Sequence, residues 1–154
     1  MGMMMDDSLK DGRAFEVEIL VGRSRPHVEI TEGVVWSRIE AGVRAVFAQG
    51  GRVRLRLLDA SDCYIRKMSM DANPGNFRMF AFTSSDDMKM EILEWWGADG
   101  GAASGYVTFD DDLWDSRKVC SDVNVALRLF GEFYSQGDLL AGLVFFRSPW
   151  DPLQ

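Results

Sequence analysis

The stretch that decides the fold is Arg52-Val53-Arg54-Leu55-Arg56-Leu57, in which charged and apolar residues alternate at every position. Successive side chains of a β-strand point to opposite faces, so this period of two predicts a strand with one apolar face and one arginine face. We expect the arginines to be solvated or to be covered by acidic side chains such as Glu16 and Glu18. The stretch therefore predicts a sheet that buries only one face.

Further strands are expected on both sides of this stretch. Alternation starts at Phe15 and continues toward Val21, and later strand patterns cover residues 63–70, 77–83, 88–96 and 106–109. The segment Asn73-Pro74-Gly75-Asn76 predicts a hairpin turn, because proline presets φ and glycine accepts a positive φ. Short strands joined by tight turns favour an antiparallel meander, since parallel strands need long crossovers.

Two amphipathic helices complete the pattern. The first has Thr31 as its predicted N-cap and ends at Gly50-Gly51. Its apolar positions recur at three- and four-residue spacing: Val35, Trp36, Ile39, Val43, Val46 and Phe47. The second helix starts near Ser121 or Asp122 and stops at Gly137.

These elements predict an α+β fold, an antiparallel β-meander of about five to six strands covered on one face by the two helices. Residues 27–30 fit either a short strand or the approach to the first helix, and residues 139–146 fit neither class securely. A chain of 154 residues has the size of one unit. We expect a flexible leader over residues 1–12 and a single α+β domain over residues 13–154.

Composition and charge argue against several classes of function. The net charge of −7 argues against nucleic acid as the partner. No run of about 18 apolar residues occurs, so we expect no membrane partner, and the acidic leader is unlike a signal peptide. The interpretation is a cytoplasmic protein in which Cys63 and Cys120 are two reduced thiols.

Motifs for catalysis or for cofactor binding are missing from the sequence. His27 is the single histidine, and no known nucleophile, phosphate-loop or zinc-protease motif occurs. The glycine-rich segment 97–105 lacks the lysine and the helix that a phosphate loop needs. Asp110, Asp112 and Asp115 resemble part of a calcium loop that lacks its glycine and its closing glutamate. We expect no enzyme, no catalytic residue, no cofactor and no metal.

Most of the negative charge is concentrated in residues 86–115, which hold nine acids and one base, Lys89. The rest of the chain holds 15 acids and 16 bases. Three tryptophans lie among these acids, and tryptophan is enriched at the centres of interfaces. The predicted partner-binding residues are Asp86, Asp87, Glu91, Glu94, Trp95, Trp96, Asp99, Asp110, Asp111, Asp112, Trp114 and Asp115. The alternative is that the acidic turns only solvate the surface.

The two adjacent tryptophans have different expected roles. Strand alternation assigns one of Trp95 and Trp96 to the core and leaves the other for a partner. If residues 88–96 and 106–109 form neighbouring strands, both acidic turns lie on one rim of the sheet.

The segment from Leu113 to Leu139, together with Trp150-Asp151-Pro152, resembles small bacterial immunity proteins of polymorphic-toxin and contact-dependent growth inhibition systems. The resemblance is clearest over residues 113–152. It implies a cytosolic α+β domain that binds and blocks a cognate toxin. The expected toxin is a nuclease-type effector, because its basic surface would attract an acidic inhibitor.

Two alternatives belong to other classes. One is a small carboxylate-dependent hydrolase that works near the acidic loops. The other is a homo-oligomeric module, in which Arg52, Arg54 and Arg56 of one copy meet the acidic rim of another. For the free protein we expect a monomer or a weak homodimer.

Overall fold

The computed structural model describes residues 14–22, 27–32, 34–58, 62–84, 90–97 and 105–149, and over residues 27–32 it describes the backbone. The main sheet has seven strands in the order β2-β1-β3-β4-β5-β6-β9, and each neighbouring pair is antiparallel. The strands are β1 (Ala14–Val21), β2 (His27–Glu32), β3 (Gly51–Leu57), β4 (Ile65–Asn73), β5 (Asn76–Thr83), β6 (Ile92–Trp95) and β9 (Phe146–Arg147).

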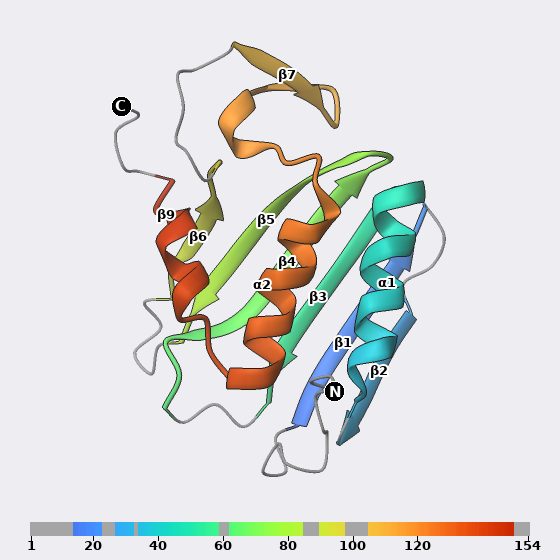
Figure 1. Ribbon diagram of the computed structural model, residues 1–154, viewed down its shortest axis with the longest axis vertical. Coiled ribbons are helices and arrows are strands. Elements are labelled where there is room, and N and C mark those ends of the chain that lie inside the picture. The colour runs from blue at the N-terminus through green and yellow to red at the C-terminus, as the bar shows by residue number, and fades with distance from the viewer. Residues whose placement is uncertain are drawn as a thin grey trace.

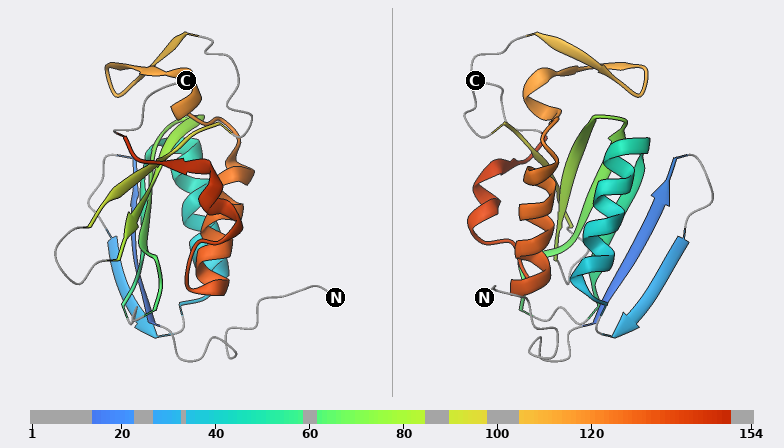
Figure 2. Two further views of the ribbon diagram at one scale, coloured as in Figure 1. Left: turned by 90° about the vertical axis from the view of Figure 1, so that its left-hand side faces the viewer. Right: turned by 45° about the vertical axis from the view of Figure 1, so that its right-hand side comes forward.

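Both long helices lie on the same face of this sheet, and no helix of the described residues lies on its other face (Figures 1 and 2). They are α1 (Trp36–Gln49) and α2 (Val123–Gln136). Two 3-10 helices, η2 (Ser116–Lys118) and η3 (Ala141–Phe145), flank α2 in the sequence. A separate hairpin of β7 (Tyr106–Phe109) and β8 (Asp112–Asp115) lies beyond one end of the sheet (Figure 1). The predicted α+β class, with both helices on one face, is confirmed.

The buried face follows from the alternation in β3. Leu55 pairs with Val17 of β1 on one side and with Met68 of β4 on the other, and all three side chains are buried. Phe130 and Phe133 of α2, both fully buried, belong to the same core. Removal of these apolar side chains from water drives the docking of the helices.

The open face carries a ladder of opposite charges. Its ion pairs join Arg56 to Glu16 (3.2 Å), Arg54 to Glu18 (3.8 Å) and Arg52 to Asp71 (3.2 Å). Of the two expectations for these arginines, solvation and cover by acids such as Glu16 and Glu18, the structure shows the second for Arg54 and Arg56. These charges are largely neutralised within the chain.

Local sequence signals determine several element ends. Gly75 has φ +89° after Pro74, as the predicted turn requires. The Asp122 carboxylate caps α2 by accepting the backbone N–H of Asn124 (3.0 Å), and Gly137 ends this helix in the left-handed region at φ 73°. These three predictions are confirmed.

The predicted start of the first helix is wrong. α1 begins at Trp36 after Val35, whose side chain makes no capping hydrogen bond. Thr31 belongs instead to β2, where it pairs with Phe15 of β1. The backbone of Thr31 is paired with β1 in the sheet and therefore does not cap the helix. Residues 27–30, for which a strand and a helix approach were both expected, belong to the strand β2.

Other boundaries differ from the expected ones by a few residues. The strand expected over residues 88–96 is β6, and residues 139–146 contain η3 and the start of β9. With β2 and β9 at its edges the sheet has seven strands, one more than the upper expected number. The expected leader lies outside the described residues, and Cys63 and Cys120 are free thiols. Over the described part of the chain, every helix is too short or too polar to span a bilayer.

The two faces of β3 predict different costs for substitutions at neighbouring positions. Leu55→Ala removes a fully buried side chain, so the free energy of unfolding should fall by about 2–5 kcal/mol. Arg54→Gln, on the open face, should change it by less than about 1 kcal/mol. Chemical denaturation of both variants measures the difference, and equal losses would contradict the assignment of the faces.

Candidate functional site

The β7–β8 hairpin is the part of the acidic segment that stands clear of the main sheet. Phe109 pairs with Asp112, so the loop consists of Asp110 and Asp111 alone. Both aspartates have positive φ, 53° and 67°, the arrangement of a type I′ turn. Aspartate tolerates this left-handed region better than most residues. Asp110, Asp111 and Asp112 are all exposed.

The outward face of the hairpin carries two large apolar side chains. Tyr106 is 72% exposed and Leu113 is 71% exposed. Leu113 lies opposite Thr108 in the register, and alternation places Tyr106 on the same face as Thr108. The hairpin thus presents an aromatic and an aliphatic side chain next to three carboxylates. We call residues 106–115 the acidic hairpin.

The inward face of the acidic hairpin is attached to the sheet through Arg78 of β5. The Arg78 guanidinium stacks 3.6 Å from the ring centre of Trp114 and pairs with Glu94 of β6 (2.8 Å). Lys118 of η2 pairs with the other oxygen of Glu94 (2.7 Å). All of these charges are largely buried, so each needs its partner. Desolvation lowers the pKa of Arg78 while Glu94 raises it, and arginine remains charged in either case.

Asp115 at the base of the hairpin is bound within the chain. Its carboxylate accepts hydrogen bonds from the Arg117 side chain (2.7 and 3.0 Å) and from the Arg117 backbone N–H (2.9 Å). These bonds, the side-chain bonds first, lower the pKa of Asp115 from 3.8 to about 2. This carboxylate supports the hairpin instead of facing a partner.

Trp95, the last residue of β6, and Trp96, which follows it, are both buried, which corrects the prediction that one of them is available to a partner. Trp95 is 6% exposed within the core, and Trp96 is 4% exposed. The ring of Trp96 lies beneath three cations, Arg147 (4.7 Å), Arg117 (5.1 Å) and Lys118 (5.5 Å). Residues distant in the sequence therefore cover the side that alternation leaves open.

The predicted acidic rim is not formed as expected. β6 pairs with β5 and β9, whereas β7 pairs with β8, so residues 88–96 and 106–109 are not neighbouring strands. Glu94 is buried, and Trp114 is covered by Arg78. Glu91 is exposed, and its backbone N–H and carbonyl form hydrogen bonds with Thr83, at the end of β5 away from the hairpin. Asp86, Asp87 and Asp99 lie outside the described residues.

Of the predicted residues, Asp110, Asp111 and Asp112 come together on an exposed surface. Tyr106 and Leu113 join them and were missed by the sequence analysis. A signal for them exists, because two alternating runs separated by a two-residue turn predict a hairpin with an outward face.

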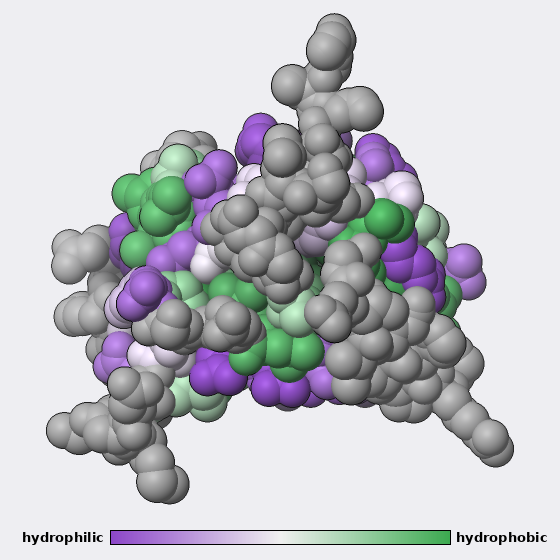
Figure 3. Space-filling model, turned by 90° about the horizontal axis from the view of Figure 1, so that it is seen from below, coloured by the Kyte–Doolittle hydropathy of each residue, from purple (hydrophilic) through white to green (hydrophobic). Residues whose placement is uncertain are grey.

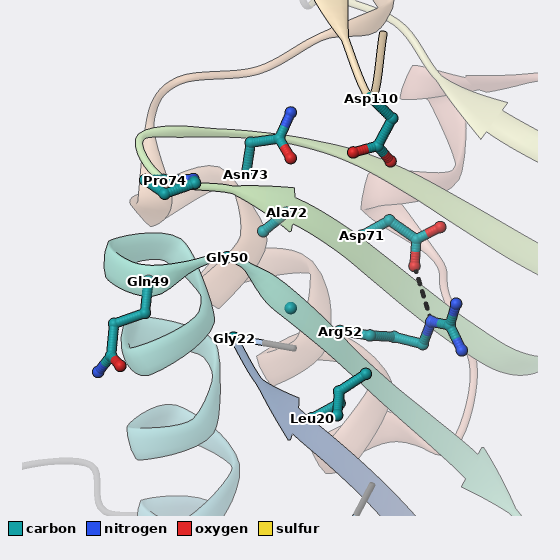
Figure 4. Close-up of a pocket in the computed structure, with 11 residues that line it drawn as sticks. Leu20, Gly22, Gln49, Gly50, Arg52, Asp71, Ala72, Asn73, Pro74 and Asp110 are labelled. Atoms are coloured by element: carbon teal, nitrogen blue, oxygen red, sulfur yellow. Dashed lines mark hydrogen bonds and ion pairs between the residues drawn. The ribbon is translucent and has the colours of Figure 1, made fainter. Parts of the chain in front are cut away.

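A small polar cavity of about 210 Å³ lies beside the hairpin tip (Figure 4). Asp110 faces it from the tip, while the Arg52–Asp71 ion pair and Asn73 line it from the sheet. The close passage of β1 past β3 forms one wall, where a Cβ at Gly51 would overlap the carbonyl oxygen of Leu20. The end of α1 adds the partial negative charge of a helix C-terminus.

The hairpin tip and the cavity both carry charged and polar groups. The cavity offers an ion pair, one further carboxylate and amide groups. Within the described ranges, no three histidine, cysteine or acidic side chains are grouped so that they could hold a metal ion. The exposed carboxylates of Asp110, Asp111 and Asp112 lie at the tip of the hairpin, and the exposed side chains of Tyr106 and Leu113 lie along its outward face.

Comparisons with known proteins show a family and a fold. Residues 17–143 match the model of a family described as "Family of unknown function (DUF6911)". No curated protein matches the chain. A crystal structure of a hypothetical protein from Neisseria gonorrhoeae is similar in fold, with a TM-score of 0.60 and 11% identity, over 92% of this chain and 96% of that one.

The buried Arg78–Glu94 pair predicts a large loss of stability when one partner is removed. Arg78→Met leaves Glu94 buried with Lys118 alone, so the free energy of unfolding should fall by about 3 kcal/mol or more. Arg44→Met is the matched control, because Arg44 pairs with Glu40 on an exposed helix surface, and it should cost less than about 1 kcal/mol. Urea denaturation measures both, and a small loss for Arg78→Met would mean that this pair does not hold the hairpin.

The lowered pKa of Asp115 predicts a contribution to stability that acid removes. The folded-state pKa of about 2 lies below the ordinary value, so the contribution is complete above about pH 4 and disappears as the pH falls toward 2. The thermal midpoints of the wild type and Asp115→Asn should therefore differ at pH 5 and converge near pH 2. A difference that does not change with pH would contradict the role of this carboxylate.

Proposed function

The chain belongs to the DUF6911 family, and we propose that it is a protein-binding domain that neutralises a bacterial toxin through the acidic hairpin. The observation that carries the proposal is the exposed pair Tyr106 and Leu113 beside three exposed aspartates on one hairpin. Large apolar side chains exposed in such a group are typical of interaction sites.

The charges and the apolar side chains act on different steps of binding. Asp110, Asp111 and Asp112 attract a cationic partner and speed its approach. Tyr106 and Leu113 lose contact with water in the complex and slow its dissociation. The buried contacts of Arg78 and Trp114 hold the hairpin in place beforehand, which lowers the entropic cost of binding.

The class of partner comes from the sequence resemblance together with the charge. The resemblance to immunity proteins over residues 113–152 includes β8 of the acidic hairpin and α2. A toxin that cuts nucleic acid needs a basic groove for its substrate, and an acidic hairpin can cap such a groove. The proposed inhibitor works in the cytoplasm, as a monomer or a weak homodimer until its toxin arrives, and itself binds neither nucleic acid nor membrane.

A second candidate function is carboxylate-dependent hydrolysis, because Asp71 and Asp110 line the same polar cavity. The ion pair between Asp71 and Arg52 argues against hydrolysis, because it already occupies one of the two carboxylates. A hydrolytic activity that Asp110→Asn abolishes, while toxin binding persists, would favour this function over inhibition.

The proposal predicts separate kinetic effects for the two parts of the hairpin. The triple variant Asp110→Asn, Asp111→Asn, Asp112→Asn keeps residues that tolerate positive φ and removes three charges. Its association with the toxin domain encoded beside its gene should slow about tenfold or more at low salt. Tyr106→Ala with Leu113→Ala should speed dissociation about tenfold or more, and surface plasmon resonance measures both rates.

The matched control removes three charges elsewhere with Glu40→Gln, Asp62→Asn and Glu91→Gln, of which Asp62 and Glu91 are exposed and Glu40 is partly buried beside Arg44. It should leave association nearly unchanged. If association slowed equally in the control and in the triple hairpin variant, the effect would come from the net charge of the protein and not from the hairpin. Failure of the wild type to bind this toxin domain, or to protect cells that produce it, would overturn the inhibitor function.

A further inference from the structure

The open face of the sheet contains an irregularity at the start of β4. Ile65 pairs with Thr83 and Lys67 pairs with Phe82, so β4 advances two residues while β5 advances one. Arg66 is the extra residue of this β-bulge. A bulge interrupts strict alternation and can place two successive side chains on one face. The burial pattern of β4 agrees with two successive side chains on the open face, because the half-buried Arg66 and Lys67 lie between the buried Ile65 and Met68.

The bulge gathers three cations around one pocket of about 250 Å³. Arg66 and Lys67 of β4 line it together with Arg56 of β3, and Phe82, Thr83 and Met90 complete it. Among the residues that the structure describes, no acidic side chain lines this pocket. Seen from below, hydrophilic side chains lie beside apolar ones along the lower edge of the molecule, which is the side of the open face (Figure 3).

The cations of this pocket are not fully neutralised by the residues that the structure describes. Arg56 pairs with Glu16, but neither Arg66 nor Lys67 forms an ion pair with a described residue. Lys67 lies directly opposite Arg56 in the strand register, and like charges in this position repel. Desolvation, followed by Arg54 and Arg56, lowers the pKa of Lys67, while Glu18 and Glu16 act in the opposite direction. Among the described residues, this part of the open face therefore holds more cations than anions.

We propose that this pocket binds a phosphate group. Two guanidinium groups and an ammonium group supply several donors to the oxygens of one anion, and a phosphate carries both the charge and the number of oxygens to use them. A carboxylate, with two oxygens and one charge, would leave part of the cluster unmatched. Phe82, over which Lys67 lies at 4.2 Å, and Met90 form an apolar wall that suits the organic part of a phosphate ester.

The site is separate from the acidic hairpin in sequence and in charge. It lies at the ends of β3 and β5 and at the start of β4, whereas the segment that follows the hairpin is bound to the other end of β5, where Phe77 and Cys120 exchange backbone hydrogen bonds. The proposal therefore does not depend on the proposed function, and each can fail without the other.

Isothermal titration calorimetry tests the site with inorganic phosphate and with phenyl phosphate, at an ionic strength held constant with chloride. We expect saturable binding in the millimolar range or tighter. Tighter binding of phenyl phosphate would identify a phosphate ester as the ligand, and equal binding would identify the free anion. Heats that do not saturate, or that sodium chloride alone reproduces, would overturn the proposal.

Substitutions locate the binding site. Arg66→Gln should weaken phosphate binding about tenfold or more, because it removes charge-assisted hydrogen bonds. Arg44→Gln is the matched control on α1 and should bind as the wild type does. Arg66→Lys keeps the charge and should retain part of the affinity, which separates loss of the ligand contact from disturbance of the bulge. Equal affinity in Arg66→Gln and the wild type would contradict the site.

Discussion

The structure depends on one constraint, that both helices cover the same face of the sheet. Each strand must then offer an apolar surface to the helices and a surface compatible with water on its other side. In β3 the first requirement is met by Val53, Leu55 and Leu57, and the second by the intervening arginines. Glu16, Glu18 and Asp71 form ion pairs with these arginines, so the positive and negative charges of this part of the open face are nearly equal. At the bulge of β4, Arg66 and Lys67 add two cations to this face that form no ion pair with a described residue.

Arg78 connects this face to the acidic hairpin. One guanidinium contacts Trp114 of the hairpin and Phe80 of its own strand, and it pairs with the buried Glu94. The cation is acceptable in a buried position because it has these partners. The acidic segment is thus divided between carboxylates that support the structure, such as Glu94 and Asp115, and those at the hairpin tip, which remain in solvent.

The alternation of residues 52–57 and the caps of α2 could be predicted because each depends on neighbours in the sequence. The burial of Trp96 could not, because its cover comes from Arg117, Lys118 and Arg147, on elements that only the fold brings to β6. The same limit applies to Thr31, whose capping pattern is overridden by pairing with β1. Of the candidate site, the three aspartates of the tip were predicted and the apolar pair was not, since charge patterns do not show which face of a strand points outward.

The hairpin shares no ladder of backbone hydrogen bonds with the seven-stranded sheet. Its outward positions 106, 108 and 113 are exposed, so new side chains there leave the registers of the large sheet unchanged. The strand pairing that the fold requires and the exposed positions that tolerate substitution therefore lie in different parts of the protein. Substitutions can therefore change the chemistry of the outward face of the hairpin while the interior of the protein stays the same.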